Sequence, residues 1–260
     1  MHMYRKFRTA AIILLILMTV FSTALAEGLK LSEDAASVEI YPYSTDLPDG
    51  PVYTYSYCYP RIDENEACAG EINGFYDYLI SDALNFSNPM MADDLFHMGI
   101  GTSSFTDISY TLRCNNGSYF SILLRKHSLV DGYEDLIYEG HTFAVEGGRA
   151  GSTVALPYLL GLLRNDVNDT WLEDRQTQKV EEFTRELVWD AISEDVADGK
   201  IVLLDGTDYD CFSENFYPEE DFYLDTDGEP VFFIQPGRIT DLSVGLLEYP
   251  IALETLYDEF

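Results

Sequence analysis

Carboxylates are the most abundant side chains in this sequence that could do chemistry. The 260 residues include 46 Asp and Glu but only 4 His. Two carboxylates held at a defined separation can hydrolyse a glycosidic bond. With so many acids the sequence singles out no pair. A cell-wall glycan hydrolase, or an accessory protein of a deacetylase, is therefore only our alternative prediction of function.

Other catalytic and metal motifs are missing from the sequence. After residue 26 the histidines are His97, His127 and His141, and none forms a His-x-x-x-His or His-Glu-x-x-His pattern. No Gly-x-Ser-x-Gly nucleophile motif occurs. Residues 148–152 are glycine-rich but have no P-loop lysine, so they predict a turn. We expect no enzyme activity, no cofactor and no metal site.

Residues 225–229 resemble the start of a calcium-binding loop. Asp225, Asp227 and Gly228 have suitable types, but the third acidic position and the distal glutamate are missing. The run therefore predicts a tight hairpin turn between two strands.

The four cysteines are Cys58, Cys68, Cys114 and Cys211. An even number of cysteines in an exported protein favours disulfides, in one of three connectivities. Their spacing fits no zinc pattern. We therefore expect disulfides, and four free thiols are the alternative.

An acidic stretch rich in aromatic residues runs from residue 201 to residue 237 and contains no Lys or Arg. Aromatic side chains supply affinity at protein interfaces, and acids steer a cationic partner. The candidate partner-binding aromatics are Tyr209, Phe212, Phe216 and Tyr217. The alternative is a solvated acidic face whose aromatics lie in the core.

The acid excess gives the chain a formal net charge of −31. Such a surface is repelled by nucleic-acid phosphates and by anionic lipid, so neither is expected as a partner. With 47% hydrophobic and 14% aromatic residues the chain can build a core, which excludes a disordered protein. A cationic protein is the kind of partner that the charge favours.

The N-terminal residues read as a secretory signal peptide. Residues 1–8 are basic, residues 9–22 are apolar, and Ala24-Leu25-Ala26 is a small-x-small cleavage site. Cleavage after Ala26 leaves 12 basic residues and all 46 acids, a net charge of −34. We expect a secreted or extracytoplasmic protein with no stable membrane anchor; an uncleaved signal anchor is the alternative. The oligomeric state is left open.

Strict alternation of tyrosines with smaller residues predicts a strand over residues 52–59. Helical spacing of apolar residues predicts a helix from Asn65 to about Asn85. Alternation on both sides of residues 115–117 predicts a β-hairpin. A further strand pair is expected over residues 136–138 and 141–145. Residues 27–50 predict a polar linker that includes a short strand over residues 37–43.

The longest predicted helix begins near Asp169 or Thr170, where Thr170 to Glu173 resembles a capping box, and ends before Gly199. Its buried stripe is Val180, Phe183, Leu187, Val188, Ala191 and Ile192. Beyond it, strands are expected over residues 201–204, 222–224, 231–234 and 246–249, and a short helix over residues 253–260. The mixture indicates an α+β fold with mainly antiparallel sheets, one medium helix and one long helix.

From residue 51 onwards, the order of these features resembles the RsiV-like extracytoplasmic domain family of unknown function, which is related to a domain found beside polysaccharide deacetylases. A tyrosine-proline strand end precedes a helix that contains Ile-Asn, here Tyr59-Pro60-Arg61-Ile62 and Glu71-Ile72-Asn73. A hairpin, a strand over residues 142–145, the Leu159-Leu160 segment and a helix follow. The closing pattern is Phe222-Tyr223-Leu224, Gly228, Val231-Phe232-Phe233-Ile234, Pro236, Ile239, Gly245 and Tyr249-Pro250-Ile251.

The resemblance implies an α+β binding domain, and in this family lysozyme is a known partner. It adds the segment after Pro236 to the candidate partner-binding residues: Arg238, Asp241 and Leu242. We therefore predict a secreted, non-enzymatic binding or sensing domain for a cationic protein such as lysozyme. Two intertwined subdomains are expected, over residues 51–148 and 149–260.

Overall fold

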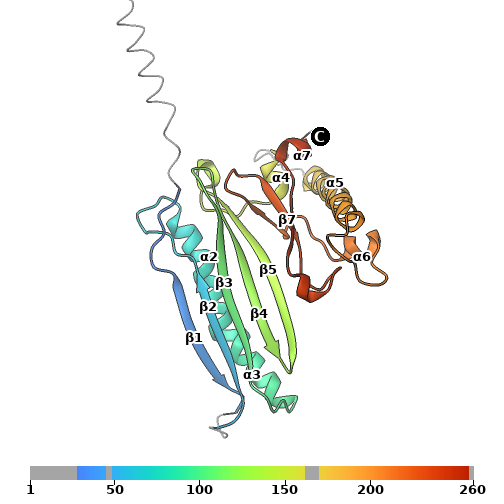
Figure 1. Ribbon diagram of the computed structural model, residues 1–260. Helices are drawn as coiled ribbons and strands as arrows, with labels where there is room; N and C mark the ends of the chain where they lie inside the picture. The colour runs from blue at the N-terminus through green and yellow to red at the C-terminus, as the bar shows by residue number, and fades with distance from the viewer. Residues whose placement is uncertain (1–27, 45–48, 162–169, 258–260) are drawn as a thin grey trace, which may run out of the picture.

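The computed structural model describes residues 28–44, 49–161 and 170–257, without the side chains of residues 170–174 and 176. The predicted signal peptide and the side chains of the predicted capping box at residues 170–173 lie outside what the structure describes. The fold is α+β, as predicted, with a five-stranded sheet in the order β1-β2-β3-β4-β5 and a three-stranded antiparallel sheet in the order β6-β7-β8 (Figure 1).

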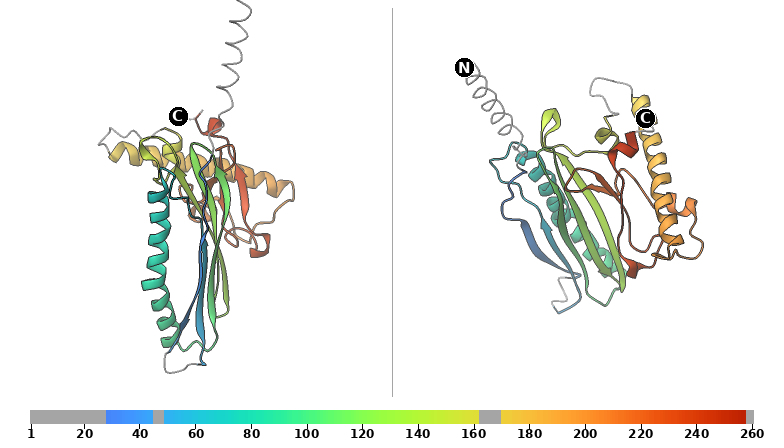
Figure 2. Two further views of the ribbon diagram at one scale, coloured as in Figure 1. Left: turned by 90° about the vertical axis from the view of Figure 1, so that its left-hand side faces the viewer. Right: turned by 45° about the horizontal axis from the view of Figure 1, so that its top comes forward.

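The five-stranded sheet contains the longest strands of the protein. They are β1 (Ala35–Pro42), β2 (Val52–Tyr59), β3 (Ser104–Asn115), β4 (Tyr119–Val130) and β5 (Tyr133–Ala144). All neighbours pair antiparallel except β2 and β3, which are parallel. A parallel pair needs a crossover, and here the crossover is helical: α2 (Ala69–Asp82), η1 (Ala83–Ser87) and α3 (Asn88–His97). These helices cover one face of the sheet (Figure 2).

Three predictions for this half of the chain need correction. The short strand expected over residues 37–43 is present as β1, but it begins at Ala35 and pairs with β2 along its whole length, so this part of the expected linker belongs to the sheet. The helix continues past Asn85, since the π-helical turn η1 leads directly into α3, whose first turn accommodates Pro89. The expected strand pair over residues 136–145 is one strand, β5. Gly140 lies within that strand and does not form a turn.

The second half of the chain builds the small sheet and the helices around it. The small sheet contains β6 (Phe222–Leu224), β7 (Pro230–Ile234) and β8 (Leu247–Pro250). The helices are η2 (Gly147–Arg149), α4 (Leu156–Leu159), α5 (Thr170–Ala197), α6 (Tyr209–Glu214), η3 (Leu242–Val244) and α7 (Leu253–Tyr257). The long helix and the turn at Gly228 are as predicted. The prediction of a strand over residues 201–204 is wrong, because only an isolated bridge from Leu203 to Thr240 forms there.

Three hydrophobic clusters hold these layers together. The first lies between α2–α3 and the large sheet and includes Tyr53, Tyr55 and Tyr59, the buried tyrosine face of β2. The second joins the small sheet to α5 through residues such as Val188 and Phe232. The third lies between the two sheets and consists of Leu123, Tyr223, Val231 and Phe233, with partly buried Tyr138 and Leu246 against them.

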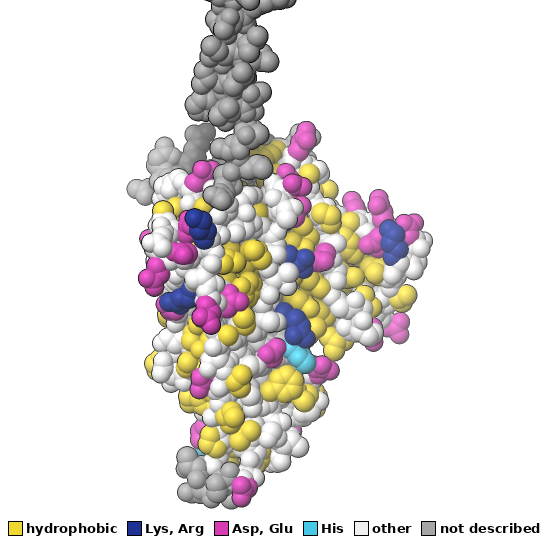
Figure 3. Space-filling view, turned by 60° about the vertical axis from the view of Figure 1, so that its left-hand side comes forward, with side chains coloured by type: hydrophobic (Ala, Val, Ile, Leu, Met, Phe, Trp, Pro, Cys, Tyr) yellow, Lys and Arg dark blue, Asp and Glu magenta, His cyan; other side chains and the backbone are white. Residues whose placement is uncertain are grey.

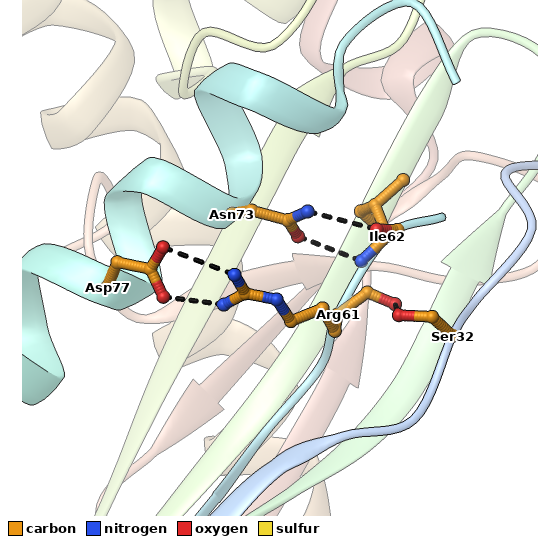
Figure 4. A network of polar contacts seen from close by, with 5 residues as sticks. All are labelled: Ser32, Arg61, Ile62, Asn73 and Asp77. Atoms are coloured by element: carbon orange, nitrogen blue, oxygen red, sulfur yellow. Dashed lines mark hydrogen bonds and ion pairs between the residues drawn. The ribbon is translucent and has the colours of Figure 1, made fainter. Parts of the chain in front are cut away.

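A polar contact fixes the entry to the first helix and involves the Ile-Asn motif of the family resemblance. The Asn73 side chain accepts a hydrogen bond from the backbone N–H of Ile62 at 2.8 Å and donates to its carbonyl at 2.9 Å (Figure 4). Beside it, Arg61 pairs with Asp77 on the next turn of α2. Because Asn73 and Ile62 are buried, these hydrogen bonds satisfy backbone groups that water cannot reach.

The backbones of the two sheets approach each other closely at Gly140. A Cβ atom at this position would lie 1.6 Å from the carbonyl oxygen of Phe222, so only glycine fits. Nearby, the backbone N–H of Leu224 donates to the Ser121 hydroxyl at 3.0 Å, and that hydroxyl also contacts Thr142. These two contacts hold β6 against β4 at Ser121 and against β5 at Gly140.

Among the residues that the structure describes, no helix combines the length and the apolar character that crossing a membrane requires.

Candidate binding cleft

A cleft of about 640 Å³ lies where the outer edge of β5 meets the second half of the chain. Four segments line it: β5 itself, the extended residues 153–155, the α6–β6 connection and the segment after β7. The lining residues are Ile137, Tyr138, Glu139, Gly140, His141, Thr142, Thr153, Val154, Ala155, Glu214, Asn215, Tyr217, Glu219, Glu220, Asp221, Phe222, Gln235 and Arg238. They include five carboxylates and one arginine.

The chain itself covers part of the β5 edge. Next to the cleft, the N–H of Val154 donates to the carbonyl of Thr142 at 2.9 Å, so residues 151–154 act as a short neighbouring strand. On the other side, the side-chain amide of Gln235 accepts from the N–H of Tyr138 and donates to its carbonyl. The amide thus takes the place that a peptide group of an added strand would occupy.

Asp221 is the most deeply buried carboxylate of the cleft, with 6% of its surface exposed. One oxygen accepts a hydrogen bond from the Gln235 amide at 2.9 Å, and the other accepts from the backbone N–H of Tyr217 at 2.8 Å. Burial raises the pKa of Asp221 to about 6 despite these hydrogen bonds. Both oxygens are therefore occupied within the protein, and the carboxyl group positions Gln235 and the chain at Tyr217.

Glu139 and His141 stand two residues apart on β5 and form a weak pair at 3.5 Å. The hydrogen bond to His141 lowers the pKa of Glu139, so Glu139 is ionised at neutral pH. The His141 ring packs edge-on against Phe75 of α2, and its buried Nδ1 atom has no hydrogen-bond partner among the described residues. Both residues line the cleft, to which Glu139 contributes a carboxylate.

Glu219 also lines the cleft. Burial raises its pKa first, and the neighbouring charges of Glu181 and Glu220 raise it further. Arg185 opposes this effect, but its guanidinium is already engaged with Glu181 at 3.1 Å. Glu219 is thus a partly buried carboxylate whose negative charge is poorly compensated within the protein.

The predicted partner-binding aromatics separate into two groups. Phe212 and Phe216 are fully buried and stack at 5.2 Å in the core, so they cannot contact a partner. Tyr209 is half-buried against Trp189. Only Tyr217, with 54% of its surface exposed, lines the cleft. Phe212 is the buried residue of α6, and Phe216 is buried in the connection that follows the helix, so these two aromatics lie in the core and not on the acidic face.

The three candidate residues after Pro236 also lie in different surroundings. Arg238 is exposed and lines the cleft. Asp241 caps η3, accepting a hydrogen bond from the N–H of Ser243 at 2.9 Å, and Leu242 packs near Gly237. Neither Asp241 nor Leu242 belongs to the cleft lining.

The expected disulfides are absent, because Cys58, Cys68, Cys114 and Cys211 are all free thiols. They lie on separate elements: Cys58 on β2, Cys68 before α2, Cys114 on β3 and Cys211 on α6. Burial raises the pKa of the Cys114 thiol to about 11, which makes it a poor nucleophile.

In the parts of the chain that are described, no cluster of three or more His, Cys, Asp or Glu has an arrangement suited to a metal ion. The calcium-like run is a turn, as predicted: the Asp225 carboxylate accepts hydrogen bonds from the N–H groups of Asp227 and Glu229.

Sequence reasoning missed Glu139, Asp221 and Gln235 as residues of one site. Gln235 follows an apolar strand directly, and a polar amide at a strand end was the available signal. Asp221 was one of ten acids in its stretch, so its burial had no signature in the sequence.

Comparison with known proteins bears on the fold of this chain. No protein-family model matches the sequence, and no curated protein matches it. A solved structure of a DUF3298 family member from Bacteroides fragilis NCTC 9343 is similar, with a TM-score of 0.54 and 14% identity over 88% of this chain and 93% of that chain. A DUF3298 family protein from Pseudomonas aeruginosa PAO1 gives a TM-score of 0.47 and 12% identity over 90% of this chain and 94% of that chain. The first likeness shows that this chain shares the α+β fold of a domain of unknown function.

Proposed function

We propose that this protein is a secreted, non-enzymatic binding or sensing domain for a cationic protein that acts on the cell envelope, with lysozyme as the first candidate. The observation that carries the proposal is the charge of the cleft, where Glu139, Glu214, Glu219, Glu220 and Asp221 face one arginine, Arg238. Opposite charge across an interface accelerates association and selects the partner.

The charge of the whole molecule supports the same kind of partner. Asp and Glu side chains are scattered over the face seen in Figure 3, with fewer Lys and Arg among them. The field of such a surface attracts cations from beyond contact distance at low salt and is screened at higher salt. Export, which would bring the protein to such a partner, is proposed from the signal-like residues 1–26.

The test is to mix the mature protein with lysozyme at low and at physiological salt and to measure binding by calorimetry. We expect a complex at low salt that weakens as salt rises. Succinylated lysozyme, whose lysines carry negative charges, is the matched control and should not bind. If native lysozyme forms no complex at either salt concentration, the lysozyme proposal fails.

The second candidate is a glycan hydrolase or deacetylase accessory acting on the cell wall. Asp221 favours it, because a carboxyl group with a pKa near 6 is suited to general acid catalysis. The engagement of both its oxygens by Tyr217 and Gln235 argues against it. Digestion of muropeptides by the purified protein, together with a metal analysis, would distinguish the two functions.

A further inference from the structure

We propose that the cleft receives a basic side chain of the partner, above all an arginine, inserted at the uncovered position of the β5 edge beside Gly140. The inference rests on the proposed function and deepens it by naming the group that is recognised and the place where it binds. Three features of the cleft carry it: a gap in the cover of a strand edge, the acceptors around that gap, and an uncompensated charge.

The gap follows from the two-residue period of a strand. Tyr138 and Thr142 both direct backbone groups away from β4, since Tyr138 bonds to Gln235 and Thr142 bonds to Val154. Gly140 lies midway between them, so its N–H and C=O point the same way. Neither group has a hydrogen-bond partner on this side among the described residues, and Gly140 lines the cleft.

The surroundings of the gap are rich in acceptors. Gly140 lines the same cleft as Glu139, Glu219 and Glu220. A guanidinium carries five N–H donors in a planar fork, so it can bond a carbonyl and a carboxylate at the same time. A lysine ammonium has three donors and is more strongly hydrated, so arginine is the better occupant.

The negative charge of the cleft favours a cationic ligand. The partly buried Glu219 carboxylate is repelled by Glu181 and Glu220, and Arg185 is occupied elsewhere. A cation placed between Glu219 and Glu220 relieves this repulsion, and charge-assisted hydrogen bonds are the stronger kind. Arg238, exposed at the same cleft, acts in the opposite direction and disfavours a cationic ligand.

The experiment measures binding of lysozyme, hexa-arginine and hexa-lysine peptides to the full mature protein and its variants. The test variant is Glu219→Gln/Glu220→Gln. The control is Glu33→Gln/Glu64→Gln, which changes the net charge equally at two exposed positions outside the cleft. We expect about tenfold weaker binding for the test variant, which corresponds to the loss of one charge-assisted hydrogen bond, and at most a twofold change for the control. Hexa-arginine should bind more tightly than hexa-lysine.

A second variant changes the affinity in the opposite direction, which a folding defect could not imitate. Arg238→Gln should tighten binding severalfold, whereas Lys30→Gln, an exposed position remote in sequence, should not. Equal loss of binding in the test and control glutamate variants, or no effect of Arg238→Gln, would refute the proposal that the cleft binds an arginine. Either result would leave the proposed function unaffected. If the wild-type protein binds none of the three probes, the proposed function itself fails.

Discussion

The side chain of Gln235 is hydrogen-bonded to both backbone groups of Tyr138, although the two residues are 97 positions apart in the sequence. Its Nε2 atom lies 2.7 Å from the Tyr138 oxygen, and its Oε1 atom lies 2.9 Å from the Tyr138 nitrogen. The same amide donates to Asp221 at 2.9 Å. One side chain thus closes the edge of β5, joins the two sheets and forms one wall of the cleft.

Replacing Gln235 should therefore destabilise the fold. Gln235→Ala leaves the N–H and C=O of Tyr138 without partners at a partly buried edge, which costs about 1–3 kcal/mol in the free energy of unfolding. Gln235→Glu should cost more at neutral pH, because its carboxylate faces the Tyr138 carbonyl and Asp221. Urea unfolding measures both. Gln178→Ala, at an exposed position of α5, is the control and should change stability by less than about 0.5 kcal/mol.

Two glycine substitutions should have opposite effects. Gly140→Ala places a Cβ atom 1.6 Å from the Phe222 carbonyl oxygen, so β6 must move away and the variant should lose at least about 3 kcal/mol or fail to fold. Gly74→Ala, at an exposed position inside α2 with nothing within 4 Å of the new atom, should stabilise the protein by about 0.5–1 kcal/mol. Thermal melts compare the two. A tolerated Gly140→Ala variant would contradict the close approach of the sheets.

The contact between Asn73 and Ile62 predicts a sensitive position on α2. Asn73→Ala leaves the buried N–H and C=O of Ile62 unsatisfied, with an expected cost of about 1–3 kcal/mol. Asn73→Asp keeps an acceptor but sets a carboxylate against the Ile62 carbonyl, so it should not rescue stability. Asn85→Ala removes an amide whose hydrogen bonds are exposed and serves as the control. If both alanine variants are equally stable, the buried contact contributes nothing.

Local patterns in the sequence were sufficient to predict elements that one periodicity describes. The tyrosine alternation of β2 and the apolar stripe of α5 are of this kind, since each reports a face buried against a neighbour. The length of β5 could not be predicted in this way. Gly140 looks like a turn residue, and its real role depends on the Phe222 carbonyl, which is more than 80 residues away in the sequence.

The cleft was predictable only in part for the same reason. Tyr217 and Arg238 were proposed from an aromatic-acidic stretch and from a family resemblance, and both line the cleft. Phe212 and Phe216 belonged to the same pattern but are buried, because the composition of a stretch does not reveal which of its side chains point inward. Four separate segments converge on this cleft, and no local signal reports such convergence.

The free thiols predict the outcome of alkylation. Mass spectrometry of the unreduced, unfolded protein should find four alkylated cysteines. In the native protein, partly exposed Cys58 and Cys211 should react before buried Cys68 and Cys114. Reduction before alkylation is the control and should add no further label. Fewer than four labels without reduction would mean that some cysteines form disulfides, as the sequence predicted.

Asp221 should make the protein more stable at low pH than at neutral pH, which is the opposite of the effect of a carboxylate whose pKa is lowered on folding. Burial raises its pKa in the folded protein from 3.8 to about 6, so the folded state holds a proton that the unfolded chain has lost. This contribution to stability is fully present below pH 4 or so and is lost as pH rises through about 6. A shift of this size corresponds to a contribution on the order of 3 kcal/mol.

The comparison of wild type with Asp221→Asn isolates this effect from the general repulsion among the other acids, which both proteins share. Whatever the fixed cost of the substitution, the wild type should lose about 1–1.5 kcal/mol relative to the variant between pH 5 and pH 7.5, as measured by urea unfolding at each pH. Asp205→Asn, which removes an exposed carboxylate from the same acidic stretch, should instead follow the wild type in parallel. If Asp221→Asn also runs parallel to the wild type, Asp221 is ionised in the folded protein throughout this range, and the cleft holds one more negative charge near pH 5 than its burial indicates.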